Sequence, residues 1–61
     1  MTELLNVREA AAELRLSVHT IRAWIFQGRL SCVRLGRRVL LRREDLEDFV
    51  NKNVVEAQKR G

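Results

Sequence analysis

Arginine is the residue whose type and spacing most directly suggest chemistry in this sequence. No aspartate or glutamate occurs between Leu14 and Arg43, and this half of the chain holds eight of the twelve basic residues. All eight are arginines: Arg15, Arg22, Arg29, Arg34, Arg37, Arg38, Arg42 and Arg43. A guanidinium group pairs with a phosphate through two parallel hydrogen bonds, whereas an ordinary solvated surface mixes both signs of charge. The tract therefore favours a nucleic acid as partner, with an ordinary solvated surface as the alternative.

A predicted helix over residues 18–27 positions the first group of these side chains. Ser17 is a good N-cap for it, and Gly28 can end it because glycine readily takes a positive φ. One stripe of the helix is apolar, and we expect it to face the core: Val18, Ile21, Trp24 and Ile25. Trp24 is interpreted as a core residue rather than a platform for a ligand.

The opposite face of this helix carries candidate DNA-binding residues. A helix that follows a shorter helix and a tight turn can enter a DNA major groove, where its outer face meets base edges. Arg22 suits either a guanine or a phosphate, and the methyl group of Ala23 can contact thymine. Hydroxyl groups near the helix N-terminus suit a phosphate. The candidates are Ser17, His19, Thr20, Arg22, Ala23 and Gln27.

Two outward residues of this helix have alternative interpretations. His19 is either a DNA contact or an exposed polar residue in the first turn. Phe26 either packs against a neighbouring element or meets a second copy of the chain, and we expect packing.

A change of period after Ser31 predicts a two-stranded hairpin over residues 32–41. Apolar residues alternate with arginines on both sides of a Gly36-Arg37 turn. This alternation predicts an outer face and tip that can contact the DNA backbone or enter the adjacent minor groove, formed by Arg34, Arg37 and Arg38. The alternative is that these arginines only protect an exposed strand edge.

Two further helices complete the single domain expected over residues 1–61. Asn6 and Glu9 have capping-box spacing and predict a helix over 7–14, with Arg15-Leu16 as a tight turn after it. The acidic run Glu44-Asp45 suits the start of a third helix over 43–52. Residues 58–61 are expected to be frayed. The predicted fold class is mainly α with a small β-hairpin, a winged helix-turn-helix of three helices and a two-stranded wing.

Length and composition exclude several function classes. The 61 residues, with a net charge of +4, are too few to enclose a deep substrate cavity, so we expect no enzyme activity. One cysteine, Cys32, and one histidine, His19, cannot form a disulfide or a Cys/His metal site. We expect no metal and no cofactor, and Cys32 is interpreted as a small, partly buried apolar residue. Without a signal peptide or a long apolar run, the protein is expected to be cytoplasmic.

These segments, in this order, resemble the excisionase-like helix-turn-helix family, which is related to the winged-helix DNA-binding domain of MerR-type regulators. The resemblance covers Leu4 to Val50 and rests on five runs: Leu4–Ala11, Leu16–Arg22, Gly28–Leu30, Val33–Arg38 and Arg43–Glu47. It implies a recognition helix in the major groove and a wing on the neighbouring minor groove. Members of this family direct excision of mobile elements together with an integrase, or act as small transcription regulators.

Three residues depart from the pattern of that family. Arg15 replaces a common turn glycine, and a positive φ there stores about 1 kcal/mol of strain. Ser31 replaces a frequent proline, and Leu40 replaces a polar residue that the family places on the outer strand face. Leu40 therefore removes one expected DNA contact and offers an apolar patch to another copy.

The sequence as a whole predicts a protein that binds double-stranded DNA sequence-specifically. An excisionase and a small transcription regulator fit it equally, and its candidate partners are an integrase or further copies of itself bound cooperatively. The alternative is a protein-interaction adaptor that has lost DNA binding.

Overall fold

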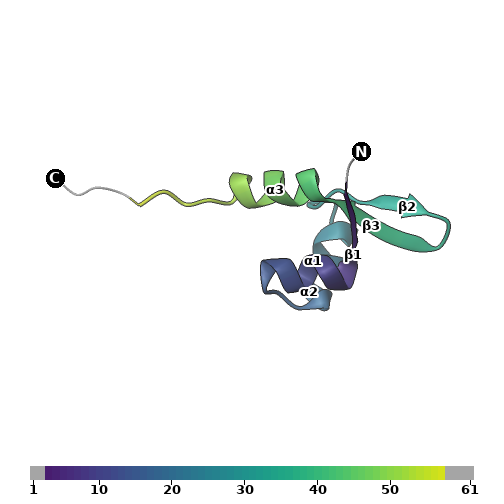
Figure 1. Cartoon of the computed structure of the whole chain (residues 1–61). Helices are drawn as coiled ribbons and strands as arrows, with labels where there is room; N and C mark the ends of the chain where they lie inside the picture. Colours follow the sequence, from purple (N-terminus) through teal and green to yellow (C-terminus); the bar gives the residue numbers. More distant parts are fainter. Residues whose placement is uncertain (1–2, 58–61) are drawn as a thin grey trace.

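The computed structural model describes residues 3–57 and shows three helices packed around a small antiparallel sheet (Figure 1). The elements in chain order are β1 (Leu4–Asn6), α1 (Val7–Leu14), α2 (Val18–Phe26), β2 (Val33–Leu35), β3 (Arg38–Arg42) and α3 (Arg43–Lys52). In Figure 1 the β2–β3 hairpin and α3 point in opposite directions, while α1 and α2 lie together on one side of the sheet. The predicted fold class is confirmed. Within residues 3–57, no helix has the length and apolar character that crossing a membrane requires.

The three helices begin at the predicted residues. α1 and α3 have the expected bounds, and α2 ends one residue early, with Gln27 as its C-cap and Gly28 beyond it at φ 75°. The capping box of α1 is complete: the Glu9 amide donates to Asn6 Oδ1 at 2.7 Å, and the Asn6 amide donates to Glu9 Oε1 at 2.9 Å. The expectation for residues 58–61 lies outside the described residues.

Strand β1 is an element that the sequence pattern did not predict. It pairs antiparallel with β3, which places β3 at the centre of a sheet with the order β1-β3-β2. Leu5 lies opposite Leu41 in this pairing, and both side chains are buried. The three residues of β1 are too few to show alternation, and their partner strand lies more than thirty residues further along the chain.

The register of the hairpin corrects the predicted faces of the wing. The Gly36-Arg37 turn makes Leu35 and Arg38 a direct pair, so Arg34 lies opposite Val39. Directly paired residues share a face and neighbours along a strand alternate. Arg34 and Arg38 therefore lie on opposite faces, and the prediction that both occupy one outer face is wrong. Leu35 shares the face of Arg38 and is 52% exposed.

The core lies between the sheet and the helices. The completely buried Ala10 and the nearly buried Ala11 allow α2 to approach α1 closely, and Ile21 of α2 fills the space between them. The buried residues are Leu5, Val7, Ala10, Ala11, Ile21, Leu30, Leu41 and Leu46. Each helix and the sheet contributes to this cluster, so the orientation of α2 is fixed by the same residues that fold the domain.

The turn between α1 and α2 contains the strained residue anticipated from the sequence. Arg15 has a φ of 58°, in the left-handed region, and it is the one described non-glycine residue with a positive φ. Its amide donates to the carbonyls of Ala11 and Ala12, and the Leu16 amide donates to Ala11 O at 2.9 Å. These bonds satisfy the last carbonyls of α1 and reverse the chain within two residues, which sets α2 against α1.

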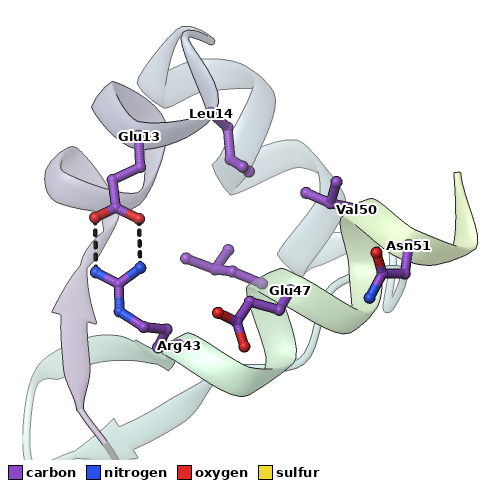
Figure 2. A pocket seen from close by; sticks show the side chains of 7 residues that line it. Glu13, Leu14, Arg43, Glu47, Val50 and Asn51 are labelled. Carbon is purple, nitrogen blue, oxygen red and sulfur yellow. Dashed lines mark hydrogen bonds and ion pairs between the residues drawn. The ribbon is translucent and has the colours of Figure 1, made fainter. Parts of the chain in front are cut away.

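Arg43, the first residue of α3, links this helix to α1 and to the residue before β1. Its guanidinium group donates to both carboxylate oxygens of Glu13 in α1, at 2.6 and 2.9 Å (Figure 2). It also donates to Glu3. The tilted ring pair of Trp24 and Phe49, with centroids 5.0 Å apart, joins α2 to α3. α3 is therefore held to α1 by an ion pair and to α2 by aromatic packing.

This ion pair leads to an expected pH dependence of stability. The hydrogen bond from Arg43 lowers the pKa of Glu13 below its usual value of 4.5. The Glu13 contribution is therefore complete above the unfolded pKa and is lost as the pH falls through the lower, folded-state pKa. Replacing Glu13 with Gln should make the melting temperature fall less steeply between about pH 5 and about pH 3.

Thermal unfolding followed by circular dichroism measures this effect. Glu13, Arg43 and Glu47 line one pocket between α1 and α3 (Figure 2). The matched control is therefore Glu47→Gln, which removes a carboxylate from this pocket but leaves the pair between Glu13 and Arg43 in place. Identical pH profiles for Glu13→Gln and Glu47→Gln would show that the pair does not stabilise the fold.

Candidate nucleic-acid interface

Helix α2 presents one buried face and one exposed face. Ile21 is completely buried, and Val18, Trp24 and Ile25 are partly buried against the core. The candidate residues that the sequence placed on the opposite face are all exposed apart from the half-buried Thr20: Ser17, His19, Arg22, Ala23 and Gln27. Their exposure makes this face available to a partner, and their contact with DNA stays a prediction.

The N-terminus of α2 is capped by side chains that can also meet an anion. Ser17 Oγ accepts a hydrogen bond from the Thr20 amide at 3.1 Å and lies 3.0 Å from Thr20 Oγ1. Two hydroxyl groups hold two protons, and their mutual hydrogen bond uses one of them. The second proton remains to be donated outward, beside the positive end of the helix dipole.

A cleft of about 320 Å³ joins α2 to the hairpin and to the start of α1. Three arginines from three different elements line it: Arg8 of α1, Arg22 of α2 and Arg37 of the β2–β3 turn. The remaining residues of its wall are Asn6, Val7 and Val39. No acidic side chain is found among these described lining residues, and the carboxylate of Glu9 accepts from the amide of one of them, Asn6, in the capping box. Three arginines around one cleft give it a positive potential.

The two other wing arginines differ in their relation to this cleft. Arg34 shares a sheet face with Val39, which lines the cleft, whereas Arg38 lies on the opposite face. All three wing arginines are exposed. Gly36, with a φ of 61°, forms the tight turn that presents Arg37 at the tip. A ligand in the cleft is therefore within the reach of Arg37 and on the same side as Arg34, but Arg38 faces away from it.

Comparison with known proteins agrees with this geometry. Residues 4–54 match the sequence model of a family described as a helix-turn-helix domain, and this match contains every helix and strand from β1 to α3. The chain belongs to this helix-turn-helix family. No solved structure matches it significantly.

A curated relative of this helix-turn-helix domain is the transcriptional repressor DcmR of Methylorubrum extorquens (strain DSM 6343 / CIP 106787 / DM4). The two are 43% identical over 51 residues, which is 80% of this chain and 19% of the repressor. The chain therefore spans about a fifth of the length of that relative, so the similarity concerns one domain of it.

Several arginines of the acid-free tract stabilise the helix-turn-helix domain itself. Arg42 donates two hydrogen bonds to Asp45, which raise the pKa of Arg42, and Arg43 is held by Glu13 and Glu3. The guanidinium carbon of Arg29 lies 5.8 Å from the centre of the Trp24 ring, at cation–π distance. The tract therefore combines arginines that hold α2 and α3 in place with arginines that face outward.

Arg8 is the residue of this cleft that the sequence analysis did not select. It lies before the acid-free tract and next to Glu9, and nothing in the neighbouring residues marks it as a DNA contact. Its neighbour Val7 is buried and Glu9 belongs to the capping box, which leaves Arg8 exposed at the start of α1. Only the packing of α1 and β1 beside the hairpin brings it to Arg22 and Arg37.

The burial of Trp24, Cys32 and Phe26 was also predicted from the sequence. Trp24 packs against the core, and Cys32 is partly buried, as expected for both. The expectation that Phe26 packs against a neighbouring element is wrong, because its side chain is 92% exposed. The helix places Phe26 opposite the buried stripe, where none of the described elements reaches it.

Proposed function

We propose that this domain binds double-stranded DNA sequence-specifically and regulates transcription without enzymatic activity of its own. The exposed face of α2 enters the major groove, and the β2–β3 turn contacts the adjacent backbone or minor groove. The observation that carries the proposal is the cleft that Arg8, Arg22 and Arg37 line together, with no acidic residue among the described residues of its lining. The similarity to a transcriptional repressor supports the regulatory role.

The proposed contacts divide the residues between two tasks. Arg22, Ala23, His19 and Gln27 face base edges, and Ser17 and Thr20 contact a phosphate at the N-terminus of α2. Arg37 and Arg34 contact the backbone on the side of the cleft, where Arg8 joins them from α1. Arg38 contacts it from the other face of the wing. A single domain of this size covers only a few base pairs, so specific binding in a genome requires repeated sites or a bound neighbour.

An excisionase role is the second candidate function. It rests on the likeness of the sequence runs to that family, and it uses the same DNA contacts with an integrase as the neighbouring protein. The similarity to a repressor favours transcription as the first assignment. Both roles place the protein in the cytoplasm, where its target DNA lies.

Selection from a pool of random duplexes, followed by equilibrium binding at several salt concentrations, tests the proposed function. We expect enrichment of a short sequence motif and a linear fall of log K with log salt, with a slope near −0.9 for each phosphate contact. If the domain binds no duplex at low salt, or if its affinity for duplex DNA does not depend on salt, it would instead be an adaptor for proteins.

A further inference from the structure

Phe26 is the most exposed large apolar side chain on the outward face of α2. It is 92% exposed, and it lies three residues after Ala23 and seven after His19. Residues with this spacing form one stripe along a helix. Arg22, which lines the basic cleft, is one turn before Phe26 on an adjoining stripe. Phe26 therefore belongs to the same surface as the candidate base contacts.

The usual direction of helical side chains leads us to expect the ring toward the middle of this surface. Long side chains on helices lean toward the N-terminus and cover the preceding turn. For Phe26 this turn contains Arg22 and Ala23, and the small side chain of Ala23 leaves room there. An occupant that approaches Arg22 and Ala23 from outside the helix would therefore meet the ring.

The surrounding charge selects the kind of occupant. The cleft that Arg22 lines, one turn before Phe26, also contains Arg8 and Arg37 and has no described acidic residue in its lining, which favours a polyanion over an ordinary protein surface. In a DNA major groove the one apolar group on a base edge is the 5-methyl group of thymine, and phenylalanine is among the side chains that contact it. The 5-methyl group of thymine is therefore a suitable contact for the ring of Phe26.

We infer that Phe26 is a specificity-determining residue that selects thymine through contact of its ring with the 5-methyl group. This inference rests on the proposed function. Phe26 contributes no hydrogen bond to the recognition. Instead, it excludes water from the methyl group at one position of the site, while Arg22 acts at a neighbouring position.

The test begins with duplexes selected from a random pool by the wild-type chain and by Phe26→Ala. We expect the wild type to enrich a thymine at one position where the variant shows no preference. Replacing that thymine with deoxyuridine removes only the methyl group. It should weaken wild-type binding about fourfold and leave binding of Phe26→Ala unchanged.

Matched controls separate this effect from folding and from the chemistry of the base. Phe26→Leu keeps an apolar group and should retain part of the thymine preference. Because Phe26 is 92% exposed, the alanine variant should melt at the wild-type temperature. A thymine-to-deoxyuridine change at the other selected thymines should affect the wild type and Phe26→Ala equally.

The outcomes distinguish this inference from the proposed function. A wild-type chain that enriches no sequence overturns the proposed function, and the inference with it. Enrichment of the same motif by both chains, or equal sensitivity of both to deoxyuridine, overturns the inference alone. A Phe26→Ala variant that loses self-association in the absence of DNA, measured by sedimentation, and keeps its thymine preference assigns the ring to an interface between copies.

Discussion

Replacing Arg8, Arg22 and Arg37 together with alanine is expected to weaken binding to duplex DNA about a hundredfold at about 0.15 M salt. The three guanidinium groups line one cleft, so a bound duplex meets all of them at once. Each lost phosphate contact also lowers the salt slope of log K by about 0.9, so the loss of Arg8 and Arg37 gives a change of about 1.8 in the triple variant. A change of about 2.7 would assign Arg22 to a phosphate instead of a base.

Fluorescence anisotropy with a labelled duplex at several salt concentrations measures both quantities. The control for net charge is Lys52→Ala, which removes one exposed positive charge from the last turn of α3.

The single variants distinguish base reading from phosphate contact. Arg22→Ala should relax sequence preference, at a cost of about 1–3 kcal/mol if it reads a base, whereas Arg37→Ala should weaken binding to all sequences similarly. A loss as large with Lys52→Ala as with Arg37→Ala would contradict the assignment of the cleft.

Replacing Leu41 with alanine is expected to remove most of the stability of the domain. Leu41 is completely buried on the central strand β3, opposite Leu5, and truncation of such a side chain costs about 2–5 kcal/mol. A domain of 61 residues has a total unfolding free energy of about 3–9 kcal/mol. The variant should therefore be largely unfolded at physiological temperature, and its DNA binding should be lost with the fold.

The control for this experiment is Leu35→Ala in the neighbouring strand. It removes the same atoms from a side chain that is 52% exposed, so the urea midpoint should change little. Urea unfolding followed by circular dichroism compares the two variants directly. Equal destabilisation by both would show that the core does not lie on the face of the sheet that contains Leu41 and Leu5.

The elements predicted correctly from the sequence are those specified by neighbouring residues. The capping box of Asn6 and Glu9 and the N-cap of Ser17 mark helix starts within one turn of the chain. Their buried stripes repeat at the helical period, so the outward face of α2 could be identified. The tight turn expected at Arg15-Leu16 is also present, with Arg15 at a positive φ.

The features that could not be predicted depend on contacts between distant segments. β1 exists because Leu4–Asn6 meets β3, and Arg8 reaches the cleft only through that pairing. The faces of the wing follow from the pairing of Leu35 with Arg38, which alternation within each strand does not specify. For Phe26, helical period gave the outward direction, but it could not show that no described element covers the ring.

The central claim is that DNA meets the outward face of α2 and the tip of the wing. Backbone amide chemical shifts, recorded by NMR while a selected duplex is added, test it most directly. The largest changes should occur at residues 17–23, 26–27 and 36–38 and at Arg8, with small changes along α3. Changes concentrated on α3 and its border with α1, and absent from α2 and the hairpin tip, would contradict the account.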